Sequence, residues 1–156
     1  MRLAEPARAA VVMAHPHPPQ GGTMHHPVLF HSESELHRSG FTTLRFNFRG
    51  VEGREGSFDD GRGELDDLAA AVAWMRREAP FLPVVLVGYS FGAWCAARLV
   101  AADQSIEGIV AIQSGEKPQL IKEKLKGFLA PRARAGEVKV LPAWYELATG
   151  AVTIVE

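Results

Sequence analysis

One junction constrains the fold of this chain more than any other feature. An apolar run at residues 84–88 passes directly into a helix-like stretch at residues 91–101. A continuous run of branched apolar residues is typical of a parallel strand that is buried on both faces. Because the helix-like stretch follows without a long linker, the two segments predict one β–α unit of an α/β fold.

The rest of the chain repeats this alternation of short apolar runs and amphipathic stretches. In the stretch at residues 64–77, apolar side chains recur at helical spacing, with acids in the first turn and two arginines in the last. We therefore predict a mostly parallel sheet between helical layers, a three-layer α/β sandwich. The other expected strands are residues 10–14, 42–46 and 109–113, and the other expected helices are about residues 24–39 and 117–129.

The end of the chain has a different pattern. Residues 138–141 and 152–155 are mostly apolar, and residues 148–150 between them are turn-like. We expect a terminal hairpin or an edge strand within residues 135–156. An open sheet edge exposes unpaired backbone donors and acceptors, so it predicts association into a homo-oligomer.

Length and composition fit one globular domain that spans residues 1–156. A chain of 156 residues buries roughly 70% of its unfolded surface, which suffices for one core. The net charge of −1 does not provide the basic face that a nucleic-acid partner needs. The single cysteine, Cys95, fits a reducing compartment, and the apolar run at residues 9–14 is too short for a signal segment or a membrane span. We expect a cytoplasmic protein with no membrane partner.

The junction itself carries a G-x-S-x-G motif at residues 88–92. A strand that reverses sharply into a helix strains the backbone of Ser90, and side chains at Gly88 or Gly92 would collide with the adjoining elements. The Ser90 hydroxyl would then stand at the carboxyl edge of the sheet, where the Phe91 N–H can donate to an oxyanion. The motif predicts a nucleophile elbow, and the alternative is a glycine-rich turn with an idle serine.

Five short blocks that include this motif follow one another between about residues 9 and 112. They are His15-Pro16-His17-Pro18, Gly21-Gly22-Thr23-Met24, Leu44-Arg45-Phe46-Asn47-Phe48-Arg49-Gly50-Val51, Phe58-Asp59 with Gly61 and Gly63-Glu64, and Gly88-Tyr89-Ser90-Phe91-Gly92-Ala93. Together they resemble the small lid-less bacterial α/β-hydrolases, serine hydrolases related to dienelactone hydrolase. The resemblance implies that Ser90 is the nucleophile. It also implies a second oxyanion donor in the first block, which is His17 because the prolines there have no N–H.

The chain departs from the resembled family where the catalytic triad should be completed. In that family an acid follows a later strand and a histidine lies near the end of the chain, but no histidine follows Ser90 here. All six histidines lie within the first 37 residues. The family's leading antiparallel strands are missing or shortened, and residues 135–156 do not resemble a hydrolase ending. We therefore expect a domain that is truncated or diverged at both ends.

A serine without a base is a poor nucleophile, because its hydroxyl stays protonated at neutral pH. The loop at residues 15–26 should lie beside the elbow, so His26 or His15 is a candidate surrogate base. The alternative is that these histidines order the loop through hydrogen bonds. The spacing of the six histidines does not match that of metal ligands, so we predict no metal site, and we expect no cofactor. The acids Asp59 and Glu64 are explained by helix capping.

Two functions remain in competition. The first is a serine hydrolase of the esterase or acyl-hydrolase type, acting on a small acyl or ester substrate and impaired by the incomplete triad. The alternative is a non-catalytic pseudoenzyme or binding domain that uses the hydrolase cleft or needs a partner chain. The G-x-S-x-G motif favours the first function, and the missing histidine favours the second.

Overall fold

A parallel sheet forms the centre of the molecule. The computed structural model describes residues 1–112, 139–140, 143–145 and 152–154. The sheet has the strand order β2-β1-β3-β4-β5, and every pair of neighbours is parallel, which confirms the predicted α/β architecture. The strands are β1 (Ala10–Ala14), β2 (Thr42–Arg45), β3 (Val84–Tyr89), β4 (Gly108–Ile112) and β5 (Lys139–Val140).

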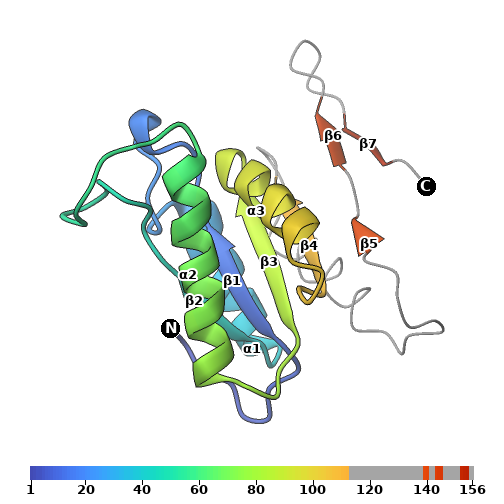
Figure 1. Cartoon of the computed structure of the whole chain (residues 1–156). Helices are drawn as coiled ribbons and strands as arrows, with labels where there is room; N and C mark the ends of the chain where they lie inside the picture. Colours follow the sequence, from blue (N-terminus) through green and yellow to red (C-terminus); the bar gives the residue numbers. More distant parts are fainter. Residues whose placement is uncertain (113–138, 141–142, 146–151, 155–156) are drawn as a thin grey trace.

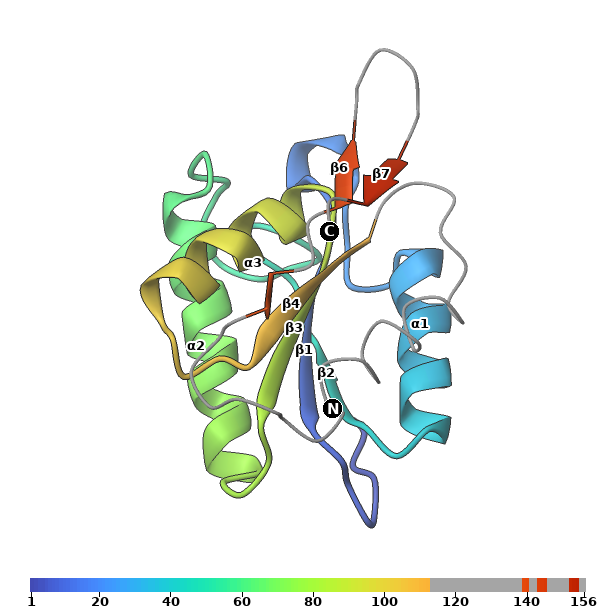
Figure 2. The ribbon, with the colours of Figure 1, turned by 90° about the vertical axis from the view of Figure 1, so that its right-hand side faces the viewer.

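Helices cover both faces of this sheet and produce the expected three layers (Figures 1 and 2). One helix, α1, lies against one face, while α2 and α3 lie side by side on the other. Each of the parallel connections from β1 to β4 carries one α-helix, as such crossovers require, and the first also carries a short 3-10 helix, η1 (Pro18–Gln20). None of the described helices combines the length and apolarity that crossing a membrane would need. The helices are α1 (Pro27–Arg38), α2 (Arg62–Glu78) and α3 (Phe91–Ala102).

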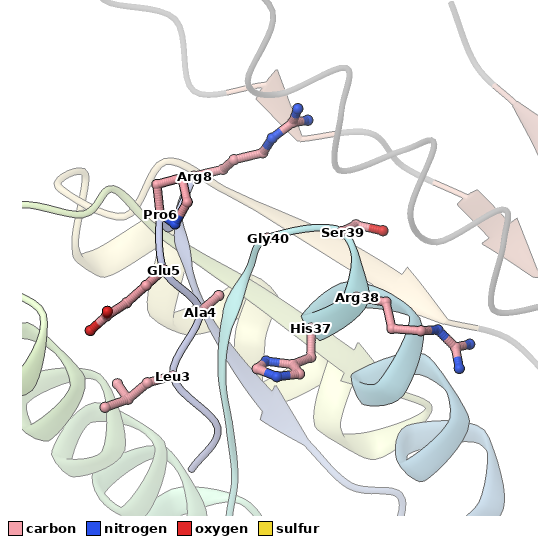
Figure 3. Close-up of a pocket in the computed structure, with 9 residues that line it drawn as sticks. All are labelled: Leu3, Ala4, Glu5, Pro6, Arg8, His37, Arg38, Ser39 and Gly40. Carbon is pink, nitrogen blue, oxygen red and sulfur yellow. The ribbon is translucent and has the colours of Figure 1, made fainter.

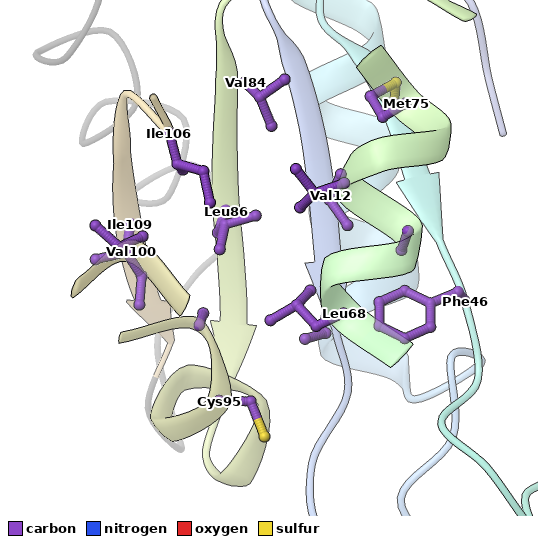
Figure 4. Close-up of a cluster of buried hydrophobic side chains, with 14 of the residues drawn as sticks. Val12, Phe46, Leu68, Met75, Val84, Leu86, Cys95, Val100, Ile106 and Ile109 are labelled. Atoms are coloured by element: carbon purple, nitrogen blue, oxygen red, sulfur yellow. The ribbon is translucent and has the colours of Figure 1, made fainter. Parts of the chain in front are cut away.

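The strands divide their side chains between two buried clusters, one on each face. Val12 and Leu86 point toward α2 and α3, where they pack with Leu68 (Figure 4). Val11 and Val85 point to the opposite face and join the cluster under α1. Because both faces are covered, the central strands are apolar at every position rather than at alternate ones.

Two helices begin where a side chain caps them, which shifts their boundaries from the predicted ones. α1 begins at Pro27 rather than at residue 24, because Nδ1 of His26 accepts a backbone N–H of the first turn at 3.3 Å. α2 begins at Arg62 rather than at residue 64, because the Glu64 carboxylate accepts the N–H of Gly61 at 2.8 Å. Both shifts are local capping effects.

The described part of residues 135–156 contains three short strands. β5 pairs with β4 at the edge of the main sheet, within the apolar run at residues 138–141. β6 (Ala143–Tyr145) and β7 (Val152–Ile154) form a separate antiparallel pair. The expected helix at residues 117–129 and the turn at residues 148–150 lie outside the described residues.

The outer edge of β2 is partly covered by the start of the chain. The N–H of Arg2 donates to the carbonyl oxygen of Thr43 at 2.8 Å, and the N–H of Thr43 donates back to Arg2 at 2.9 Å. This is an isolated antiparallel bridge.

We predict that Leu86→Ala lowers the free energy of unfolding by about 2–5 kcal/mol, because a fully buried side chain is replaced by a cavity. Urea unfolding followed by circular dichroism measures the change. Phe81→Ala is the control, since Phe81 is 95% exposed, and it should change the free energy by less than about 0.5 kcal/mol. Equal losses in the two variants would contradict the described core.

Candidate active site

Ser90 lies at the junction of β3 and α3 in an unusual backbone conformation. Its φ is 53° and its ψ is −114°. A positive φ strains a residue that has a side chain, and it persists only where the surrounding structure enforces it. Ser90 is exposed at the carboxyl edge of the sheet. The structure therefore contains the sharp strand-to-helix turn that the motif predicts.

The two glycines of the motif allow this turn by lacking side chains. A Cβ on Gly88 would lie 2.4 Å from the backbone of Ala93, and a Cβ on Gly92 would lie 2.3 Å from the carbonyl oxygen of Ala14. Both distances are far inside van der Waals contact. Any larger residue at either position would push α3 away from the strands that it covers.

The predicted oxyanion donors, His17 and Phe91, are brought together beside Ser90. β1 and β3 end in register, because Ala14 pairs with Gly88, so the loop after β1 emerges next to the turn after β3. The rings of His17 and Phe91 meet edge to face, with centroids 5.3 Å apart. Phe91 is the first residue of α3, so its N–H has no acceptor within the helix. Their role as donors stays a prediction.

His15 is fully buried and uses both of its ring nitrogens within the protein. Nε2 accepts the N–H of Phe48 at 3.0 Å, and Nδ1 donates to the carbonyl oxygen of Pro16 at 2.7 Å. This pattern requires the neutral ring. Burial also lowers the pKa of His15 below its ordinary value. These contacts favour the loop-ordering alternative for His15, because neither nitrogen is left to accept the Ser90 proton.

His26 lies against Tyr89, the residue before Ser90, with ring centroids 4.9 Å apart. Its Nδ1 accepts the N–H of Val28 and caps α1, while its Nε2 has no hydrogen-bond partner among the described residues. In that same part of the chain, no hydrogen bond joins the Ser90 hydroxyl to His26 or to His15. The surrogate base therefore stays a prediction, and of the two histidines the geometry favours His26.

The acids in the loop before α2 have structural roles. The Glu64 carboxylate accepts the N–H groups of Gly61 at 2.8 Å and of Asp59 at 3.0 Å. Asp59 in turn accepts the N–H of Gly63 at 3.2 Å. These bonds satisfy donors at the beginning of α2 and confirm the capping interpretation.

An ion-pair network around Asp67 fixes the loop between β2 and α2, and it was not predicted from the sequence. Asp67 accepts the backbone N–H of Arg49 at 2.8 Å, its Nε at 3.1 Å, and Nη2 of Arg54 at 3.0 Å. The hydrogen bond to Asp67 raises the pKa of Arg49 above its ordinary value. One signal was present in the sequence: Asp67 adjoins Leu68 on the apolar face of α2, where a carboxylate needs a partner.

Two further reactive side chains, Cys95 and Asp103, have no role at Ser90. Burial raises the pKa of the Cys95 thiol to about 12, so Cys95 is a protonated thiol at neutral pH. Asp103 follows α3 at the amino edge of the sheet, where hydrogen bonds from Ser105 and Arg76 lower its pKa. Among the described residues, no cluster of three or more His, Cys, Asp or Glu side chains could hold a metal ion.

A pocket of about 610 Å³ lies away from Ser90 (Figure 3). Residues that precede β1 and the end of α1 line it, so it opens at the amino edge of the sheet, whereas Ser90 is at the carboxyl edge. The charged side chains of Glu5, Arg8 and Arg38 point away from one another (Figure 3). This pocket therefore contributes nothing to the chemistry at Ser90.

The buried state of His15 predicts that acid destabilises the protein. The pKa of an unfolded histidine is about 6.5 and that of folded His15 is lower, so below about pH 6.5 the unfolded state binds more protons and stability falls. Urea unfolding between about pH 8 and pH 5 should show the advantage of the wild type over His15→Asn narrowing as the pH falls. The matched control is His31→Asn, since His31 is exposed. Parallel curves for wild type and His15→Asn would contradict this prediction.

Sequence and structure both match known hydrolases. A model of the α/β hydrolase family matches residues 11–154. The structure of a serine hydrolase without a lid from Xanthomonas campestris is 38% identical, with a TM-score of 0.64 over 70% of this chain and 52% of that one. The structure of an α–β serine hydrolase homologue from Coxiella burnetii is 38% identical, with a TM-score of 0.62 over 66% of this chain and 49% of that one. An uncharacterised protein of Rickettsia prowazekii is 38% identical over 112 residues, which cover 71% of this chain and 47% of that protein.

The chain spans about half the length of each of these relatives. The family match nevertheless covers most of the chain, and it includes the strands, the helices and the turn that carries Ser90. As the five motif blocks predict, the chain belongs to the α/β hydrolase family, and its structural relatives are lid-less bacterial serine hydrolase homologues.

Proposed function

We propose that the chain is a serine hydrolase in which Ser90 attacks the carbonyl carbon of a small ester. The observation that carries this proposal is the strained backbone of Ser90, with its φ of 53°. Strain of this kind costs about 1–3 kcal/mol and concentrates at functional sites, where it holds a reactive group in place. The relatives described as serine hydrolases support the same class of reaction.

The proposed reaction passes through a covalent acyl-serine. The Ser90 oxygen bonds to the carbonyl carbon as its hydroxyl proton passes to a base, and the carbonyl oxygen becomes an oxyanion. The N–H groups of Phe91 and His17 donate to this oxyanion, and the amino end of α3 stabilises its charge. Collapse of the intermediate expels the alcohol, which takes up the proton. Water then attacks the acyl-serine by the same steps in reverse and releases the acid.

His26 is the base that we assign to this reaction. Its ring contacts Tyr89, and its Nε2 is the ring nitrogen that does not cap α1. A neutral imidazole at this position can take the Ser90 proton directly or through one water molecule. His15 is not assigned this role, because its Nε2 joins the loop after β1 to the loop after β2 and its Nδ1 is bonded to Pro16 within the first of these loops.

A non-catalytic binding domain is the second candidate function. The observation that favours it is that His15 and His26 already serve structural hydrogen bonds and that, among the described residues, neither ring is bonded to the Ser90 hydroxyl. Such a domain would keep the turn at Ser90 and the loop after β1 for binding an acyl or ester group. The two candidates differ in whether Ser90 forms a covalent bond.

We predict that Ser90→Ala abolishes both labelling by a fluorophosphonate probe and turnover of para-nitrophenyl acetate, because the hydroxyl that forms the acyl-serine is gone. An enzyme that lacks one member of a triad retains an acceleration of about 10³–10⁴ over water, so wild-type turnover should be slow but measurable. Intact-mass spectrometry and absorbance provide the two readouts. Ser57→Ala is the control, since Ser57 is also an exposed serine. Absence of any labelling of the wild type would favour the binding domain.

His26→Asn tests the base without removing the helix cap. Asparagine is a good capping residue, so α1 should keep its first turn, but an amide cannot take a proton at neutral pH. We expect kcat to fall by about 10²-fold or more, with no matching loss in thermal stability. His31→Asn should leave kcat unchanged. If turnover survives in His26→Asn and is lost in Ser90→Ala, His26 is not the base.

A further inference from the structure

We propose that Trp94 and the rings packed around it bind an aromatic group of the substrate, so that esters with an aryl group beside the scissile bond are preferred over their alkyl counterparts. This inference rests on the proposed function, because it concerns the substrate class of the Ser90 site. It is carried by a set of four rings that we call the aromatic cluster. The cluster consists of His17, Phe58, Phe91 and Trp94.

The aromatic cluster is built around Phe91, the residue directly after Ser90. The Phe91 ring stacks on Trp94 with centroids 5.7 Å apart and an interplanar angle of 22°, and it meets Phe58 at 5.6 Å. His17 completes the aromatic cluster, since its ring centroid lies 4.8 Å from that of Phe58 and 5.3 Å from that of Phe91. The cluster therefore includes both residues that supply the proposed oxyanion donors.

Trp94 is the part of the cluster that is open to a ligand. It lies one helical turn after Ser90, and its backbone N–H donates to the Ser90 carbonyl oxygen at 3.2 Å. Helical side chains lean toward the amino end of their helix, so the indole is carried toward the Ser90 edge. Trp94 is 44% exposed, whereas the other three rings are half-buried.

The Trp94 ring is held in place before any ligand binds. A Cβ on Gly61 would lie 2.3 Å from the indole, so the glycine provides the space in which the ring sits. On the α3 surface, the Arg98 guanidinium lies 4.9 Å from the ring centroid in a cation–π contact. A ring fixed by its neighbours loses little conformational freedom when a ligand binds, so the exposed edge of Trp94 is a preorganised binding surface.

The size of this surface fits a small aromatic ligand and not a protein. A stable protein interface buries about 800 Å² on each partner, and one partly exposed indole is a small fraction of that. Ring edges and faces favour contact with another ring, because aromatic pairs gain about 0.5–1.5 kcal/mol beyond the area that they bury. This energy corresponds to a preference of about two- to tenfold for an aryl over an alkyl group of similar size.

Two matched substrate pairs test the proposal on the full chain. Para-nitrophenyl hydrocinnamate and para-nitrophenyl 3-cyclohexylpropanoate share a leaving group, and their acyl groups differ only in whether the terminal ring is aromatic or saturated. Benzyl acetate and cyclohexylmethyl acetate share the acyl group, and their alcohols differ only in whether the ring is aromatic or saturated. We expect kcat/KM to favour the aryl member of at least one pair by about two- to tenfold, after correction for alkaline hydrolysis rates. The pair that shows the preference identifies the side of the ester that meets Trp94.

Two variants assign the preference to the aromatic cluster. Trp94→Leu keeps an apolar side chain but removes the ring, and it should bring the aryl-to-alkyl ratio close to one. Phe81→Ala removes an aromatic ring that is 95% exposed in the α2–β3 connection, and it should leave the ratio unchanged. A ratio that survives in Trp94→Leu, or no preference in either pair, would overturn the proposal while Ser90-dependent turnover still stood.

A binding measurement separates failure of this inference from failure of the proposed function. Hydrocinnamamide and 3-cyclohexylpropanamide are unreactive analogues of similar size, and nuclear magnetic resonance can follow the Trp94 indole N–H, which is identified by its absence in Trp94→Leu. The aryl amide should shift this signal in Ser90→Ala at concentrations at which the alkyl amide does not. If the aryl amide shifts the indole signal but the wild type does not hydrolyse any of the esters, the hydrolase proposal fails and the aromatic site stands. If no shift occurs, the aromatic site fails.

Discussion

The contact between the beginning of α3 and the end of β1 is the constraint on which the rest of the site depends. Only a glycine at position 92 allows the helix backbone to approach the carbonyl oxygen of Ala14 so closely. Gly88 permits the same approach of Ala93 to β3. With both contacts made, the residue between strand and helix has no room for an ordinary conformation, and Ser90 takes a positive φ. The loop after β1 is held beside the turn by the same contact.

The sequence was sufficient for the two central strands, β1 and β3, and for the helix that follows β3. β1 was predicted at its observed bounds, because five consecutive apolar residues end at a proline-rich loop. β3 and α3 differ from their predicted ends by one residue, since glycines mark the turn between them. α1 and α2 were displaced more, because their starts depend on capping by His26 and Glu64. The sequence shows that such side chains are present but not which N–H they accept.

Only the part of the site that is formed by residues adjacent in the sequence could be predicted. The turn at Ser90 follows from neighbouring residues, so it was anticipated together with its steric cause. The roles of His15 and Asp67 depend on partners far along the chain, at Phe48 and at Arg49. The aromatic cluster draws its rings from three separate segments, which no spacing rule connects. Side chains that meet across the fold are determined by packing, and a single sequence does not report packing.

The short bridge between Arg2 and Thr43 affects how this protein behaves in concentrated solution. A bare edge strand is a template on which a strand of another molecule can add, and such addition begins aggregation. In β2, however, Thr43 already has both its N–H and its carbonyl oxygen engaged by Arg2. A second molecule must first break these two hydrogen bonds before it can extend the sheet on this side. The colloidal stability of the protein therefore depends in part on a residue at the very start of the chain, far from Ser90.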